Sequence, residues 1–196
     1  MRSVWVGLRP LVRASAMEAE NTQALSREHT VAIGRSGLVT VTGGKWTTYR
    51  AMAEDVLEQC VDRRLLPRRR GTSTEQLPLL GAHPGKSLTG PPGEHLYGSE
   101  AAALHRLRGA KRWLWRDGDG GLTEAMVRFA VRHEFARTVE DVLARRSRLL
   151  VLDAKAVAGI AHEVAAVIAD ELGEGFDADA SAASFIALAS RYATPP

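Results

Sequence analysis

The sequence predicts an α+β chain in which a few strands and one helix are followed by an all-α C-terminal helical domain. Three observations support this fold class: β-branched runs in the first third of the chain, a Pro/Gly-rich stretch after residue 64, and apolar residues at helical spacing beyond residue 95. We therefore divide the chain into a first unit over 1–64, a connector over 65–95 and a helical domain over 96–196.

The first unit combines extended segments with one amphipathic helix. Strands are expected over 3–12, 29–33 and 38–42, with a turn at 34–37. The third strand leads directly into Gly43 and Gly44, and a helix over 47–61 follows, since apolar residues recur there at helical spacing.

The junction at Gly43 and Gly44 is the strongest functional signal in the residues themselves. Two glycines let the chain turn without a Cβ and let a planar or anionic group approach the backbone. The unpaired N–H groups of the next helical turn face such a group, and Lys45 adds a positive charge. A strand, two glycines and a helix start therefore favour a cofactor site.

The second half of the chain reads as a series of helices. Thr138 and Asp141 have the spacing of a capping box, Asp153 can cap a long helix, and Gly173 can end it. Helices are expected over 99–107, over 122–135, from Thr138, over 153–173 and over 179–192.

Composition excludes several classes of protein. With 196 residues, 45% hydrophobic and 25% charged, the chain has an ordinary globular balance and is not wholly disordered. Cys60 is the only cysteine, which excludes an intrachain disulfide and a thiolate metal cluster, and we expect it to be a small buried residue. No apolar run approaches the ~20 residues of a membrane span. The net charge of +3 suits an anionic substrate, a membrane surface or nucleic acid.

Other motifs favour structural roles. The segment 81–87 nearly spells a phosphate-binding loop, but only three residues separate its glycines. The segment 117–121 resembles the start of a calcium loop, but Arg128 occupies the twelfth position, so a solvated turn is expected. The histidines at 29, 133 and 162 lack acids at metal spacing, so no metal site is predicted. No stacking aromatics interleave with the arginines of 63–70, which argues against nucleic acid.

Three ordered blocks carry a resemblance to a known family. The blocks are 3–12, which contains GLRP, 26–30, which reads SREHT, and GGKWTTYRAMAED from Gly43. They resemble the C-terminal half of FAD-dependent glycerol-3-phosphate dehydrogenases, bacterial and mitochondrial. Residues 133–146, HEFARTVEDVLARR, are similar to the signature of the helical C-terminal domain of these enzymes. The resemblance makes 1–64 a truncated piece of the FAD and substrate domain of an oxidoreductase.

The resemblance also implies roles for individual residues. Arg9 and Arg27 would orient the phosphate of sn-glycerol 3-phosphate, with Lys45 near both substrate and flavin; arginine forks match phosphate oxygens bidentately. Trp46 is either a core anchor or part of the flavin wall. The residues implied to contact FAD are Gly43, Gly44, Lys45, Trp46, Thr47 and Thr48.

No catalytic residue can be assigned. The Gly-rich fingerprint of a βαβ dinucleotide fold does not occur in the sequence, and the histidine base of the family belongs to that part of the enzyme. We therefore expect a fragment that lacks the N-terminal half and is inactive alone. The complete enzyme would oxidise sn-glycerol 3-phosphate to dihydroxyacetone phosphate and pass electrons through FAD to quinone.

Two alternatives stay open. The first is a fragment of a glycerophosphate oxidase that uses oxygen; the second is a non-catalytic helical interaction module. The resemblance implies a cytoplasmic location. Because the family delivers electrons to membrane quinone, it also suggests peripheral contact with the inner face of the cell membrane. The missing N-terminal half and the respiratory chain would be the protein partners.

Overall fold

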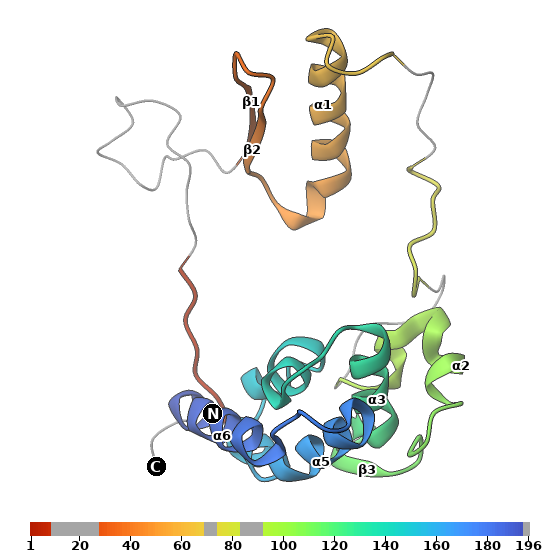
Figure 1. Cartoon of the computed structure of the whole chain (residues 1–196), viewed down its shortest axis with the longest axis vertical. Coiled ribbons are helices and arrows are strands. Elements are labelled where there is room, and N and C mark those ends of the chain that lie inside the picture. The colour runs from red at the N-terminus through yellow and green to blue at the C-terminus, as the bar shows by residue number, and fades with distance from the viewer. Residues whose placement is uncertain (9–27, 69–73, 83–91, 194–196) are drawn as a thin grey trace. The chain divides into compact units, whose positions relative to one another are not determined.

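The computed structural model describes residues 1–8, 28–68, 74–82 and 92–193 (Figure 1). It divides into two compact units. We call residues 7–77 the hairpin unit, and residues 1–6 together with 78–196 the helical unit. Small two-stranded sheets and a helical C-terminal part confirm the predicted α+β class. The domain boundaries at 64 and 95 stay a prediction.

The hairpin unit consists of an antiparallel strand pair and a helix. Strand β1 (His29–Ile33) pairs with β2 (Val39–Gly43), with His29 opposite Gly43. A short 3₁₀ turn, η2 (Trp46–Thr48), leads into α1 (Tyr49–Asp62), which contacts β1. Both strands and the helix are confirmed within two residues of their predicted bounds. Cys60 is buried on α1, as expected.

The predicted strand over 3–12 is wrong for its described part. Residues 3–8 form no strand; the N–H of Val4 instead donates to the carbonyl of Tyr192 at 2.8 Å. The Ser3 hydroxyl donates to the carbonyl of Leu150 at 3.0 Å and accepts from the N–H of Ala154 at 2.8 Å. The bond to Tyr192 thus satisfies a backbone N–H that a neighbouring strand would otherwise have satisfied, and Ser3 attaches the segment through its side chain. Residues 1–6 belong to the helical unit, and the start of this segment lies beside α6 (Figure 1).

The helical unit holds the larger core. Its elements are η3 (Glu94–Glu100), α2 (Ala101–Leu104), β3 (Trp113–Asp117), β4 (Gly120–Thr123), α3 (Glu124–His133), η4 (Asp141–Arg146), η5 (Leu149–Val151), α4 (Ala154–Ala158), α5 (Ala161–Leu172) and α6 (Ala178–Tyr192). Helix α5 packs against both α3 and α6, and α4 packs against α6. Phe129, Leu143, Ile168 and Phe185 are fully enclosed between these elements.

A hairpin that the periodicity did not predict precedes α3. Strands β3 and β4 pair antiparallel, and Asp117 lies opposite Gly120 across the turn that was expected there. The helix predicted over 122–135 begins at Glu124, because Thr123 ends β4 and its hydroxyl accepts from the N–H of Met126 at 3.3 Å. Gly121 has a φ of 146°, and a Cβ there would lie 2.2 Å from the Trp115 carbonyl oxygen. The hairpin therefore requires this glycine.

The helix predicted over 153–173 is two helices. Asp153 caps α4 by accepting from the N–H of Ala156 at 3.0 Å, and the chain turns at Gly159 before α5 begins. The capping box at Thr138 is confirmed: the N–H of Asp141 donates to its hydroxyl, and its own N–H donates to the Asp141 carboxylate, each at 3.1 Å. The last predicted helix is confirmed as α6, with a cap at Asp177.

No helix in the described ranges is long and apolar enough to cross a membrane. Within the same ranges, no group of three or more acidic, histidine or cysteine side chains is arranged to hold a metal ion.

Candidate functional site

The two glycines after β2 adopt conformations that side chains disfavour. Gly43 has a φ of 75° and Gly44 a φ of 81°. A Cβ on Gly43 would lie 2.5 Å from the backbone oxygen of Glu28, and one on Gly44 would lie 2.5 Å from the sulfur of Met52. Backbone geometry and close approach thus both require glycine at this junction, as the sequence predicted.

The helix start beyond the glycines is open to ligands. Neither η2 nor α1 has a side-chain cap. The Thr48 hydroxyl donates to the carbonyl of Lys45 at 3.0 Å and so does not occupy the first N–H groups of the helix. Lys45, Trp46, Thr47 and Thr48 all have exposed side chains. Uncapped N–H groups beside a lysine form a positive surface that suits an anionic or electron-rich group.

Trp46 lies on this open surface. Its side chain is 85% exposed, so the alternative that it anchors the core of this unit is wrong. Its ring stacks on Tyr49 with centroids 5.4 Å apart and an interplanar angle of 26°. A stacked, exposed indole can present a flat wall to a planar ligand.

A polar tie that the sequence did not predict holds the junction. His29 Nε2 lies 2.7 Å from Asp55 Oδ2, and the amide of Gln59 donates to both Asp55 oxygens at 3.1 Å. These hydrogen bonds, from Gln59 first and from His29 second, lower the pKa of Asp55. Since His29 pairs with Gly43 and Asp55 lies on α1, the tie joins the two sides of the junction. The four-residue spacing of Asp55 and Gln59 was the available signal.

Arg9 and Arg27 lie outside the described residues, so the structure does not test the phosphate trio. It does bring together the six residues expected at a flavin, which are Gly43, Gly44, Lys45, Trp46, Thr47 and Thr48, on one exposed turn beside His29. Their contact with a cofactor stays a prediction.

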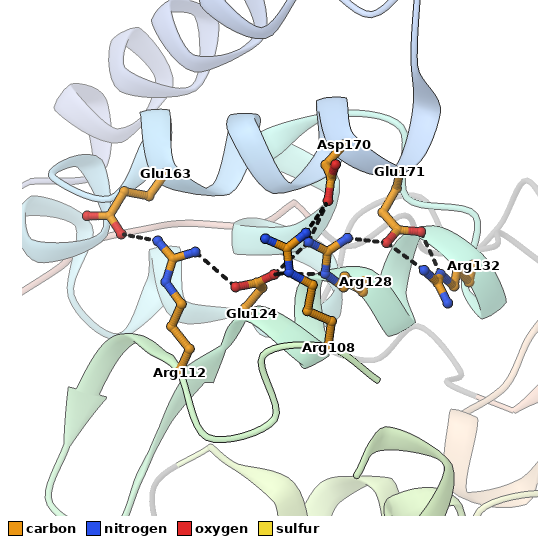
Figure 2. A network of polar contacts seen from close by, with 8 residues as sticks. All are labelled: Arg108, Arg112, Glu124, Arg128, Arg132, Glu163, Asp170 and Glu171. Atoms are coloured by element: carbon orange, nitrogen blue, oxygen red, sulfur yellow. Dashed lines mark hydrogen bonds and ion pairs between the residues drawn. The ribbon is translucent and has the colours of Figure 1, made fainter. Parts of the chain in front are cut away.

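A second polar cluster lies in the helical unit, where Arg128 of α3 bonds to three carboxylates (Figure 2). Its guanidinium donates to Glu124 at 2.6 Å, to Asp170 at 2.7 Å and also to Glu171. Only 5% of the Arg128 side chain is exposed, against 3% for Glu124 and 6% for Glu171. Burial alone would lower the pKa of Arg128, but the bonds to Glu124, Glu171 and Asp170 outweigh it and raise the pKa.

The outer members of this cluster complete its charge balance. Arg112 lies 2.9 Å from Glu124 and 4.0 Å from Glu163, and Arg132 lies 2.5 Å from Glu171. Arg108 contacts Asp170 at 3.3 Å. The eight drawn side chains carry four positive and four negative charges in total (Figure 2). A neutral, mutually bonded set is typical of a structural network rather than an anion site.

The signature over 133–146 also has a structural role. Arg137 donates to the carbonyls of Val131 and Ala136 at 3.2 and 2.9 Å, and Arg146 donates to that of Glu134. These carbonyls close α3 and the turn after it, where a helix end leaves acceptors without intrahelical partners. The two arginines therefore fix the path between α3 and η4.

The hairpin unit with its open glycine junction and the mostly helical second unit define an α+β chain with a helical C-terminal part. Residues 72–178 match the family described as the C-terminal domain of alpha-glycerophosphate oxidase. The chain belongs to this family, which confirms the resemblance found in its sequence blocks.

Relatives extend the similarity beyond the matched domain. The chain is 38% identical over 191 residues to a probable mitochondrial glycerol-3-phosphate dehydrogenase of Caenorhabditis elegans. The aligned region covers 87% of this chain and 26% of that protein. It is 38% identical over 170 residues to glycerol-3-phosphate dehydrogenase 1 of Mycobacterium tuberculosis, covering 81% and 33% respectively. A mitochondrial glycerol-3-phosphate dehydrogenase of Arabidopsis thaliana is 32% identical over 198 residues, covering 86% and 31%. The chain thus spans a third or less of the length of these relatives. No solved structure matches it significantly.

Proposed function

We propose that this chain forms the C-terminal part of an FAD-dependent dehydrogenase that oxidises sn-glycerol 3-phosphate to dihydroxyacetone phosphate. The observation that carries the proposal is the glycine junction, whose left-handed residues and uncapped helix start lie within a sequence 38% identical to named glycerol-3-phosphate dehydrogenases. Alone, the chain is an inactive fragment that needs an N-terminal half.

The junction suits FAD because the helix start has no side-chain cap and the side chains from Lys45 to Thr48 are exposed, so a ligand can reach this turn. Gly44 and the backbone of Lys45 would border the flavin, Trp46 would form a flat wall, and Thr47 would supply an N–H group. Thr48 would contribute its exposed side chain, because its own N–H already donates to the carbonyl of Lys45 at 3.0 Å. Bound flavin supplies the acceptor for the hydride from C2 of the substrate. The uncapped helix start stabilises negative charge placed against it.

Arg9, Arg27 and Lys45 form the phosphate site in this proposal. A phosphate monoester carries nearly two negative charges at neutral pH, which two guanidinium forks and one ammonium group balance. Neither arginine lies among the described residues, so the proposal rests on Lys45 at the junction and on the relatives. Replacing Arg9 or Arg27 by alanine in a complete enzyme is expected to raise KM for glycerol 3-phosphate strongly, and an unchanged KM would contradict the assignment.

Quinone is the electron acceptor we propose, with the protein in the cytoplasm and peripherally attached to the inner face of the membrane. The matched family name favours a second candidate, an oxidase that reduces oxygen. A third candidate is a helical interaction module without catalysis.

Reconstitution distinguishes these functions. The chain is mixed with the part of the Mycobacterium tuberculosis relative that it does not cover, and flavin absorbance, dye reduction and oxygen uptake are measured with glycerol 3-phosphate. We expect bound flavin and dye reduction, both lost in Gly43→Val. Gly118→Val is the matched control, because Gly118 also has a positive φ but no neighbour within 4 Å of an added Cβ. Oxygen uptake without dye reduction would favour the oxidase, and no flavin binding would favour the module.

A further inference from the structure

The helical unit contains a cavity of about 220 Å³ that is separate from the junction and from the ion network. It lies where η3, the start of β4, the end of α3 and η4 meet. Leu96, Leu122 and Met126 contribute apolar walls, and Glu100, Glu134 and Arg146 contribute charges. At about 30 Å³ per water, the space holds about seven waters or a short alkyl chain.

Glu134 leaves an acceptor unsatisfied in this cavity. Its Oε2 is buried and has no hydrogen-bond partner in the described chain. The nearby Arg146 does not supply one, since its guanidinium donates to the backbone carbonyl of Glu134 and to Asp141 at 3.4 Å. A buried carboxylate oxygen without a donor is costly, and native structures normally satisfy such groups with a partner.

The surroundings of Glu134 favour a cation as that partner. Burial raises the pKa of its carboxyl and so favours the neutral form; the Arg146 charge opposes the rise and the Glu100 charge adds to it. A cation beside Glu134 would favour the ionised form instead. Burial, followed by the Glu134 charge, raises the pKa of Tyr97, which keeps its phenol neutral. Among the described residues of the lining, two carboxylates against one guanidinium leave one negative charge in excess when both carboxylates are ionised.

The geometry limits the kind of cation. No group of three metal-ligating side chains occurs in the described ranges, which disfavours a metal ion. A single unsatisfied oxygen suits the compact ammonium group better than the planar guanidinium fork, which pairs with two oxygens. The apolar walls can hold an aliphatic stem behind the charge.

We propose that this cavity binds a primary alkylammonium group, with the Glu134 carboxylate as its counter-ion and Leu96, Leu122 and Met126 around its stem. The group can belong to a free small amine or to a lysine side chain of another polypeptide. Nothing in this site depends on flavin or on the glycerol 3-phosphate chemistry.

Methyl NMR of the whole chain tests the proposal, because Met126 lines the cavity and its methyl resonance reports occupancy. n-Butylammonium is titrated against n-butanol, which has the same stem without the charge. We expect a saturable shift of the Met126 methyl with the amine and at least tenfold weaker binding of the alcohol. An equal response to both probes would overturn the proposal without any variant.

A variant then assigns the counter-ion. Glu134→Gln preserves shape and is expected to weaken amine binding at least tenfold, whereas Glu174→Gln, at an exposed position outside the cavity lining, leaves it unchanged. Unchanged affinity in a folded Glu134→Gln chain would refute the assignment. A lysine peptide that binds more tightly than butylammonium, and loses binding on acetylation of the lysine, would identify a polypeptide source; equal affinity would identify a free amine.

Discussion

Replacing Arg128 by methionine would remove the central cation of the ion network in Figure 2 while keeping much of its aliphatic volume. Losing one partner of a buried ion pair typically costs about 3 to 5 kcal/mol. Here Glu124 keeps Arg112 at 2.9 Å and Glu171 keeps Arg132 at 2.5 Å, so neither buried carboxylate is left alone. We therefore expect the lower end of the range, a loss of about 3 kcal/mol in the free energy of unfolding.

Arg132→Met is the matched control, since Arg132 bonds the same Glu171 from a side chain that is 48% exposed. Arg128 continues to satisfy Glu171 in that variant, so we expect a loss of about 1 kcal/mol or less. Both variants are unfolded with urea in a Trp46→Phe background, where the remaining tryptophans belong to the helical unit. A loss below about 1 kcal/mol for Arg128→Met, or equal losses in both variants, would refute this view of the network.

The network also predicts a pH dependence. Hydrogen bonds from Arg128 to Glu124, and from Arg132 and Arg128 to Glu171, lower the pKa of both carboxyls from 4.5. A lowered folded-state pKa stabilises the fold above pH 4.5, and this contribution is lost as pH falls through the folded-state value. The stability difference between wild type and Arg128→Met should therefore shrink below pH 4.5.

Three further predictions concern the other sites. Gly43→Ala should destabilise the hairpin unit by at least about 1 to 3 kcal/mol. The loss should exceed that of Gly44→Ala, because a Cβ at Gly43 meets backbone, whereas one at Gly44 meets the movable end of Met52. Comparable hydrogen exchange in α1 of both variants would contradict this. Glu134→Gln should stabilise the chain at pH 7. The fold raises the pKa of Glu134 above 4.5, so ionising this carboxyl at higher pH costs stability in the folded wild type. Thermal melts should show that the gain vanishes below pH 4.5. Asp55→Asn should weaken the tie to His29 and speed amide exchange at Gly43 and Gly44, with no such change in Glu58→Gln on the same helix.

Local patterns predicted the elements whose signals lie within a few residues. The strand pair before Gly43, the capping box at Thr138 and the last helix all have such signals, and all are confirmed. The turn at the glycine junction was predictable for the same reason, because two adjacent glycines between a strand and a helix indicate a backbone conformation that other residues disfavour.

Features that depend on distant partners could not be predicted. The β3–β4 hairpin contains Trp, Leu and Gly in a pattern too short to separate from a loop, and its register depends on the fit of Gly121 against Trp115. Arg128 pairs with acids more than forty positions away, so only the folded α3 and α5 reveal the network. Residues 3–8 were misassigned because an apolar, extended segment suits a strand until its actual partners on helices are known.

The attachment of Ser3 and Val4 to the helical unit has a consequence for how the chain is made. These residues leave the ribosome long before Leu150 and Tyr192, the positions that accept their hydrogen bonds. Joining positions 3 and 150 closes a loop of 147 residues, at an entropic cost of about 4 kcal/mol from chain length alone. The whole of residues 7–77 is synthesised within that interval and can condense first. The segment nearest the start of this sequence is thus among the last to find its place.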